Sequence, residues 1–313
     1  MSIKPRIIIA GGSGFLGRSL CGVLLTRGYE VVVLTRVPAR APAGAIGVGW
    51  DGRTRGDWVR QVDGAHAVVN LAGRNVNCRY TERNLAEINA SRVDSVRVVN
   101  QAIKDCDVPP QALVQASTLA IYGDAGERWC DESAPCGRGV PVDTAAAWEA
   151  AFNEIPTPRT RRVVLRISFV LERGRGALKT LDTLTRCFLG GRAGTGRQYV
   201  SWIHVHDMNA TFLRAIESAD MEGIYNATSP GPVTNRDFMR ALRRALGRPW
   251  APPAPAWLAH MGAFLMRTEA VLALTGRRGE PKRLVEGGFE FRFRELSEAL
   301  GDLYGWNECG EVF

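Results

Sequence analysis

Three glycines near the start of the chain have the spacing of a phosphate-binding turn. Residues 6–36 read RIIIAGGSGFLGRSLCGVLLTRGYEVVVLTR, with Gly11, Gly14 and Gly17 three residues apart. Gly11 allows a tight turn, Gly14 lets a pyrophosphate approach the backbone, and Gly17 lets the following helix pack closely. Phosphates at such a turn meet unpaired N–H groups and the positive end of the helix dipole. The pattern predicts a dinucleotide held by Gly11, Ser13, Gly14, Phe15, Leu16 and Gly17.

The residues after the second strand indicate which dinucleotide. NAD sites usually have an acidic residue about 20 residues beyond the glycines, where it bonds the ribose hydroxyls. Here Thr35 and Arg36 occupy that place. A carboxylate would repel a 2′-phosphate, whereas an arginine can bind one bidentately, and Arg18 could close the other side. Both arginines could instead be solvated surface charges. The residues favour NADP.

These side chains need a strand, a turn, a helix and a second strand to position them. Residues 7–10 and 31–34 are short apolar runs typical of buried parallel strands, and an apolar-periodic helix ending before Gly28 lies between them. Further strands and helices alternate along the chain. The pattern predicts an α/β fold, a Rossmann doubly wound parallel sheet with a smaller α/β C-terminal substrate domain. We place the NADP-binding domain at 1–168, with about 203–228 returning to it, and the substrate-binding and C-terminal domain at 169–313.

Composition and charge limit the partners. Hydrophobic residues make up 45% of the 313 and charged residues 23%, which is an ordinary soluble profile. The net charge is +8, but the basic residues are scattered, and the densest cluster is a predicted helix face at Arg236, Arg240, Arg243, Arg244 and Arg248. No basic groove with interleaved aromatic residues accompanies it. We therefore expect a small-molecule substrate, no nucleic acid, and a monomer or homodimer.

The cysteines and apolar segments indicate the compartment. Seven cysteines are dispersed without a C-x-x-C pair, which favours reduced thiols and no metal site. The first apolar run is the strand of the nucleotide site, so we expect no signal peptide. Residues 257–274 are apolar but interrupted by His260, Arg267 and Glu269, which predicts a buried helix and no membrane contact. We expect a cytoplasmic protein.

Several motifs resemble those of extended short-chain dehydrogenase/reductases. The glycine turn is similar to their TGxxGxxG signature, with Ala10 in the threonine's place. Residues 70–73, Asn-Leu-Ala-Gly, resemble their NLAG/HLAA element, which implies that Leu71, Ala72 and Gly73 pass close to the adenosine ribose and phosphate. I-x-x-S-R at 88–92, GRQ-x-x-x-WIH at 196–204 and PKRLVEGGFEFRF at 281–293 resemble a narrower branch, the atypical "epimerase family" group.

The branch resemblance covers essentially the whole chain and implies further contacts. Glu87 and Arg92 would touch NADP, although surface charges are an alternative for both. Val170 would line the nicotinamide pocket. The substrate cleft would be bordered by Arg197, Gln198 and Trp202, with Arg197 and Gln198 able to hold an anionic or carbonyl group.

Hydroxyl side chains that could act on a carbonyl lie near residue 120. Extended short-chain reductases place a catalytic Ser or Thr four residues before the tyrosine of a YG motif. Thr118 has this place before Tyr122, with Ser117 adjacent. Their hydroxyls could polarise a substrate carbonyl for hydride attack, or could merely satisfy the strand end.

The Tyr-x-x-x-Lys dyad usual in these enzymes is missing. Residues 147–149, Ala-Trp-Glu, resemble the end of the dyad helix, so the lysine position holds Ala145 and the tyrosine position Pro141. The lysine would hold the nicotinamide ribose and lower the pKa of the tyrosine. Tyr122 is the nearest replacement phenol.

Three hypotheses remain. The first is an NADP-dependent oxidoreductase or epimerase-like enzyme acting by hydride transfer on an unknown carbonyl or hydroxyl substrate. The second is a non-enzymatic NADP(H)-binding sensor or regulator that kept the cleft and lost the dyad. The third is a nucleotide-sugar epimerase or dehydratase, which normally depends on that dyad.

Overall fold

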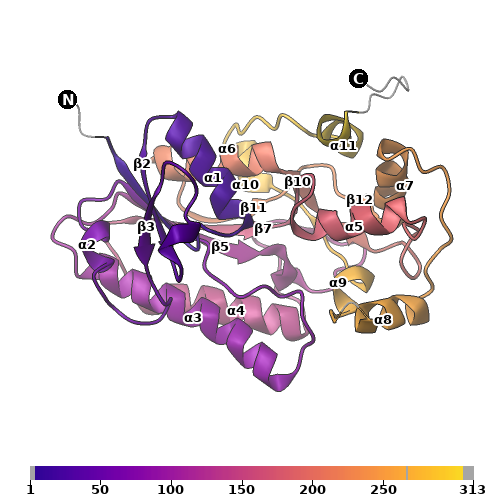
Figure 1. Ribbon diagram of the computed structural model, residues 1–313, viewed down its shortest axis with the longest axis horizontal. Helices are drawn as coiled ribbons and strands as arrows, with labels where there is room; N and C mark the ends of the chain where they lie inside the picture. The colour runs from indigo at the N-terminus through magenta and orange to yellow at the C-terminus, as the bar shows by residue number, and fades with distance from the viewer. Residues whose placement is uncertain (1–3, 266, 306–313) are drawn as a thin grey trace.

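A seven-stranded parallel sheet forms the centre of the molecule (Figure 1). The computed structural model describes residues 4–265 and 267–305, so Cys309 lies outside the described residues. The strand order is β11-β7-β5-β4-β1-β2-β3. The strands are β1 (Arg6–Ala10), β2 (Glu30–Thr35), β3 (Ile46–Gly49), β4 (Ala67–Asn70), β5 (Ala112–Thr118), β7 (Arg161–Ile167) and β11 (Gly223–Ala227). The predicted doubly wound α/β sheet is confirmed.

Helices cover both faces of this sheet because its strands are apolar on both sides. In β1, Ile7 and Ile9 belong to one core cluster and Ile8 to the other, as the two-residue strand period requires. Helices α1 (Phe15–Thr26) and α6 (Val205–Glu217) cover the first face. The second face carries α2 (Val59–Val62), α3 (Glu82–Lys104) and α4 (Val140–Glu154) (Figure 1).

Local signals place the ends of the helices. Gly28 has φ +85° after α1, its N–H donates to Leu25 O, and the next N–H, of Tyr29, donates to Leu24 O. This pair of bonds is a Schellman ending, which satisfies the last carbonyls of the helix. Thr81 caps α3, because its side chain accepts a hydrogen bond from Asn84 N.

The strand order reverses beside β1, between β2 and β4. At such a switch point the loops leaving adjacent parallel strands diverge to opposite faces and open a crevice at the carboxyl ends. Gly11 follows β1 at this edge, Arg36 follows β2, and Leu71 follows β4. The fold therefore brings the predicted cofactor residues of three separate segments to one edge.

The remaining chain forms a smaller C-terminal region, at the right of Figure 1. It has its own core, which includes Trp202, Phe238 and Leu242. Its helices are α5 (Gly176–Arg186), α7 (Asn235–Ala245), α8 (Ala256–Leu265), α9 (Val271–Leu274) and α11 (Leu296–Tyr304). Three strand pairs accompany them: β8 (Phe169–Leu171) with β10 (Trp202–His204), β9 (Tyr199–Val200) with β12 (Val233–Thr234), and β6 (Trp129–Cys130) with β13 (Arg278–Gly279). Helix α10 (Lys282–Glu286) instead packs against β11, and its Leu284 belongs to the first-face core of the main sheet.

Within residues 203–228, α6 lies on the first face of the main sheet and β11 pairs with β7. The domain boundary at 168 stays a proposal. Within the ranges 4–265 and 267–305, every helix is too short or too polar to cross a membrane. The same ranges contain no cluster of three His, Cys, Asp or Glu side chains that could hold a metal ion.

Candidate functional site

The glycine turn after β1 is built by close backbone contacts. Gly11 has φ +76°, and a Cβ there would lie 3.0 Å from backbone atoms of Ala72. A Cβ at Gly17 would lie 2.4 Å from the Cα of Gly12. Gly17 therefore allows α1 to lie close to the glycine turn, rather than close to a strand of the sheet. Gly14 is exposed, and a Cβ there would meet only Gly11 O, at 3.3 Å.

The N-terminus of α1 is chemically open. Its N-cap is Gly14, no side chain caps the first turn, and that turn contains no acidic residue. The first amides of a helix have no partner within the helix, so they are available to an external acceptor. An anion is the acceptor that the helix dipole favours. These residues fit the pyrophosphate of a dinucleotide.

Side chains from two segments brace the turn. Ser13 Oγ lies 3.1 Å from Thr35 Oγ1, which ties the turn to the end of β2. Arg18 donates to Ser13 O at 2.8 Å and to Arg40 O at 2.7 Å. Arg36 is exposed at the same edge. The two predicted arginines thus differ, because Arg18 holds the turn in shape while the Arg36 side chain faces solvent.

The loop after β4 is clamped onto α3 by the I-x-x-S-R motif. Ser91 Oγ accepts from Arg74 N at 2.9 Å, and Arg92 Nη1 donates to Arg74 O at 3.1 Å. Glu87 forms ion pairs with the side chains of Arg74 and Arg83. Glu87 and Arg92 therefore meet the same residue, Arg74, although five positions separate them on the helix. A local pattern could not reveal this, because the shared partner is 13 or more residues away.

Arg92 itself is deep in the structure. Its guanidinium lies 5.0 Å from the Trp148 ring, and its Nη1 also donates to Ile88 O at 3.0 Å. Burial lowers the pKa of Arg92 to about 10. Its side chain also borders Gly73, where a Cβ would lie 3.3 Å from Arg92 Cζ. Arg92 thus lines the loop that the sequence assigned to the cofactor.

Thr118 and Ser117 differ in what their hydroxyls are free to do. Thr118 is half-buried at the end of β5, and its Oγ1 accepts from Ala120 N at 3.2 Å. The proton of this hydroxyl remains available to a second acceptor. Ser117 is buried, and its hydroxyl donates to Glu149 Oε1 at 2.6 Å. Thr118 is therefore the better placed of the two for contact with a substrate.

Tyr122 lies inside a polar network. It is fully buried, and its hydroxyl accepts from Arg166 Nη1 at 2.9 Å. The same hydroxyl lies 2.8 Å from both Asn226 Oδ1 and Asp131 O. Burial raises the pKa of Tyr122, against a lowering by Arg166. Because this phenol is enclosed and its pKa is raised, we correct its assignment from proton transfer to positioning of the turn after β5.

The missing dyad has a structural counterpart. Ala145 is fully buried in a small cluster with Leu119, Tyr122 and Cys130. Pro141 lies in the first turn of α4, where its missing N–H is tolerated and its fixed φ suits the helix. The space beside Ala145 is filled by apolar side chains rather than left for an ammonium group.

The predicted substrate residues have different surroundings. Trp202 is fully buried, and its indole N–H donates to Gly231 O at 2.7 Å, so the structure removes it from the candidate substrate contacts. Gln198 Nε2 donates to Ala193 O and Ala273 O, which ties this segment to α9. Arg197 is exposed, and Val170 is buried in the first-face core.

A turn after β3 also borders the site, and the sequence pattern did not identify it. Trp50 N donates to Thr35 O at 3.0 Å, and the buried Trp50 ring packs edge-to-face on Trp58. The Asp51 carboxylate accepts hydrogen bonds from the Thr54 hydroxyl and from the N–H groups of Thr54 and Arg53, which lower its pKa to about 2. In the sequence, the Trp50-Asp51 pair directly after a short strand could have identified this turn.

Comparisons with known proteins identify the family of this chain. Residues 7–149 match the model of the NAD dependent epimerase/dehydratase family, and residues 254–303 match a domain of unknown function, DUF1731. The epimerase family protein SDR39U1 of Bos taurus is 35% identical over 95% of this chain and 99% of its own length. The epimerase family protein YfhF of Bacillus subtilis is 32% identical over 95% of this chain and 97% of its own length.

Solved structures give the same result. The crystal structure of human epimerase family protein SDR39U1 with NADPH has a TM-score of 0.86 and 31% identity, and covers 96% of this chain and 99% of its own. A nucleoside-diphosphate sugar epimerase from Corynebacterium glutamicum has a TM-score of 0.77 and 26% identity, over 99% of this chain and 59% of its own.

Proposed function

The chain belongs to the family of epimerase family proteins that includes SDR39U1 and YfhF, and on this premise we propose that it binds NADP(H) for a redox reaction on a small carbonyl or hydroxyl substrate. The observation that carries the proposal is the uncapped N-terminus of α1 at the same sheet edge as Arg36. That edge offers backbone donors for a pyrophosphate and a guanidinium for a 2′-phosphate. The human relative is crystallised with NADPH, which supports the choice of cofactor.

Each part of the cofactor has a proposed set of contacts. The turn at 11–17 would hold the pyrophosphate, Thr35 and Arg36 the 2′-phosphate end, and Leu71, Ala72 and Gly73 the adjoining ribose. Glu87 would hold Arg74 in place, while Arg92 would line the cleft beside Gly73. Val170 would line the nicotinamide pocket. When bound, the nicotinamide would supply or accept a hydride.

Thr118 would polarise the substrate carbonyl. Its Oγ1 already accepts a hydrogen bond from Ala120 N, so its own proton can be donated to a carbonyl oxygen. A hydrogen bond that strengthens as charge develops on that oxygen accelerates hydride addition without a tyrosine. Arg197 and Gln198 would border the substrate.

A second candidate function is a non-enzymatic NADP(H) sensor. It is favoured by Pro141 and Ala145 at the dyad positions and by the enclosed hydroxyl of Tyr122. A nucleotide-sugar epimerase or dehydratase is a further alternative. It is supported by the C. glutamicum structure but opposed by the absence of the dyad.

The test separates binding from turnover. NADPH and NADH are titrated by fluorescence, and NADPH absorbance is then followed with aldehydes, quinones and nucleotide sugars. We expect tighter binding of NADPH and turnover of at least one class. Thr118→Val should lower turnover by about 10²-fold, while Thr118→Ser should retain most of it. Tight NADPH binding with no turnover across the panel would favour the sensor.

A further inference from the structure

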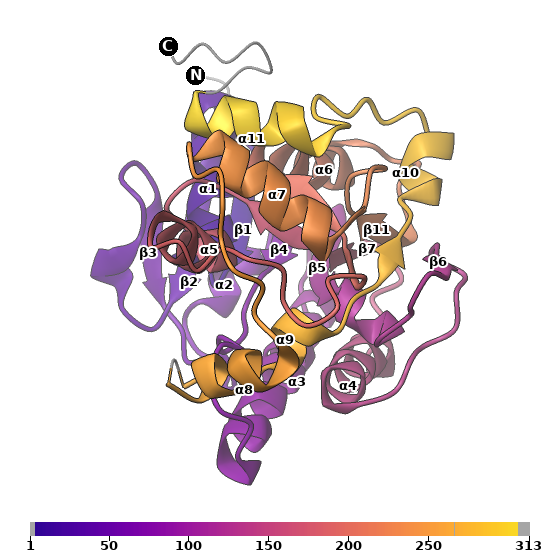
Figure 2. The ribbon, with the colours of Figure 1, turned by 90° about the vertical axis from the view of Figure 1, so that its right-hand side faces the viewer.

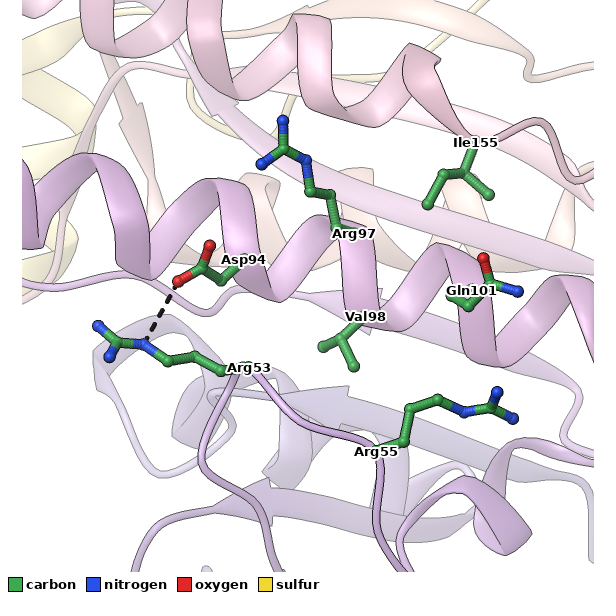
Figure 3. Close-up of a pocket in the computed structure, with 7 residues that line it drawn as sticks. All are labelled: Arg53, Arg55, Asp94, Arg97, Val98, Gln101 and Ile155. Atoms are coloured by element: carbon green, nitrogen blue, oxygen red, sulfur yellow. Dashed lines mark ion pairs between the residues drawn. The ribbon is translucent and has the colours of Figure 1, made fainter.

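Many arginines of this chain are already neutralised by a partner. A hollow of about 510 Å³ between α3 and the 51–56 loop is lined by three of them (Figure 3). Each forms an ion pair: Arg53 with Asp94 at 3.3 Å, Arg55 with Asp105 at 2.8 Å, and Arg97 with Glu154 at 2.7 Å. These guanidinium groups need no further anion, so the hollow does not point to a charged ligand.

Arg277 is a half-buried arginine with a different environment. Its backbone is fixed on both sides, because its N–H donates to Tyr199 O at 3.2 Å and its carbonyl accepts from Ser201 Oγ at 2.8 Å. Figure 2 shows this part of the chain rising from α9 to α10 past β6. The C-terminal region therefore delivers Arg277 to the sheet domain on a rigid segment.

The strand pairing shows which way Arg277 faces. Arg278 opposes Trp129 across β13 and β6, and its guanidinium lies 3.8 Å from that ring. Gly279 is on the other face, where a Cβ would lie 2.3 Å from Leu119 Cδ2. Side chains two residues apart in an extended segment share a face. Arg277 thus faces the turn after β5, which begins directly after Thr118.

Arg277 has no ion-pair partner in the described part of the chain, although Asp124 lies near enough to favour its charge. The Arg277 side chain is half-buried, and among the described residues it forms no ion pair and no side-chain hydrogen bond. Asp124 is the nearby acidic group, and its Oδ1 accepts from Gly276 N at 3.1 Å. Burial lowers the pKa of Arg277, and the charge of Asp124 opposes this effect. A half-buried arginine with unused donors is well suited to a carboxylate or phosphate.

We propose that Arg277 is an anion-binding residue of the substrate cleft, which selects substrates that carry a carboxylate or phosphate group close to the reacting carbon. That the bound anion belongs to a substrate rests on the proposed function, whereas the anion site itself does not. Asp124 repels the incoming anion and tunes its affinity. The C-terminal region thereby contributes charge recognition to a site whose proposed carbonyl contact, Thr118, comes from the sheet domain.

The experiment measures anion binding with the cofactor site filled. Protein saturated with NADPH is titrated with inorganic phosphate and, separately, with acetate at constant ionic strength, by calorimetry. We expect saturable binding of at least one anion, and the stronger of the two identifies the group. Arg277→Gln should weaken it about tenfold or more, while Arg277→Lys should retain part of it. Asp124→Asn should strengthen it.

Arg278→Gln is the matched control, because it removes a neighbouring guanidinium from the opposite face and should leave binding unchanged. Equal binding by the wild type and Arg277→Gln, or no binding of either anion, would overturn the proposal. If Arg277→Gln fails to fold, the proposal is tested by modifying the accessible arginines of the wild-type holoprotein with phenylglyoxal. The peptide with Arg277 should be modified and then protected by phosphate or acetate, and a lack of protection refutes the site.

These results separate the two proposals. Anion binding through Arg277 without turnover of any substrate class would support the anion site and contradict the proposed enzymatic function. Turnover that is equal for neutral and anionic carbonyl compounds, and unaffected by Arg277→Gln, supports the enzyme and removes the anion site.

Discussion

The Ser117 hydroxyl donates a 2.6 Å hydrogen bond to Glu149 Oε1, the same carboxylate oxygen that receives Arg166 Nε at 2.9 Å. Arg166 Nη2 reaches the second oxygen at 2.8 Å, so the pair is bidentate and nearly buried. Burial alone would lower the pKa of Arg166. Glu149 and Tyr122 raise it by a larger amount, so the pKa of Arg166 lies above its ordinary value. This cluster joins the end of β5 to α4 and sets the turn on which Thr118 lies.

Removal of the carboxylate should destabilise the fold. Glu149→Gln leaves the buried Arg166 guanidinium without its counter-charge, so we expect the free energy of unfolding to fall by about 3–5 kcal/mol. Ser117→Ala removes one hydrogen bond to the same group and should cost about 1–2 kcal/mol. Urea denaturation measures both. A loss below about 1 kcal/mol for Glu149→Gln would show that the ion pair is not the anchor of this turn.

Arg36 should determine the cofactor preference. Arg36→Asp replaces the guanidinium with a charge that repels a 2′-phosphate and can bond ribose hydroxyls. We expect NADPH affinity to fall roughly a hundredfold and NADH affinity to rise, as measured by fluorescence titration. Arg60→Asp is the control, because Arg60 is exposed on α2 and pairs only weakly with Asp57. Unchanged discrimination in Arg36→Asp would assign the 2′-phosphate to other residues.

Two glycines of α1 should respond in opposite directions. Gly17→Ala would place a methyl group 2.4 Å from Gly12 Cα, so the turn must shift. We expect a loss of about 1–3 kcal/mol and weaker NADPH binding. Gly22→Ala meets no atom within 4 Å and should stabilise the protein by about 0.5–1 kcal/mol with binding unchanged. Thermal melts with and without NADPH test the pair, and similar behaviour of the two variants would contradict the assigned contact.

The sequence allowed the sheet, the glycine turn and the helix ends to be predicted because each depends on near neighbours. Thr81 caps a helix through Asn84, and Gly28 needs only a positive φ. The TM-scores and family matches confirm the fold that these signals indicated.

The partners of the site residues could not be predicted in this way. Trp202 has the motif position of a substrate contact, yet tertiary packing buries it and Gly231 takes its indole N–H. Tyr122 is a phenol at the right distance from Thr118, but Arg166 and Asn226 engage its hydroxyl from strands more than 40 residues away. A local pattern gives the residue type and the element, while long-range contacts decide whether the functional atom is free.

His204 should make the stability of the protein depend on pH. It is buried at the start of α6, where Nδ1 accepts from His206 N at 3.1 Å, and burial lowers its pKa to about 4 against raising contributions from Asp302 and Asp207.

The direction of the effect follows from the depressed pKa. Between pH 6.5 and about 4 the unfolded chain binds a proton at this histidine and the folded chain does not. The stability from neutral His204 is therefore complete above pH 6.5 and is lost as the pH falls through about 4, with a total of about 3 kcal/mol. His204→Asn keeps an acceptor for the cap and removes the titration. Urea unfolding across this range should show a flatter pH dependence in the variant, because the variant lacks the His204 titration. Carboxylates titrate in both proteins, so the difference between the two curves measures the contribution of His204. Parallel curves would mean that His204 is protonated without cost in the folded state.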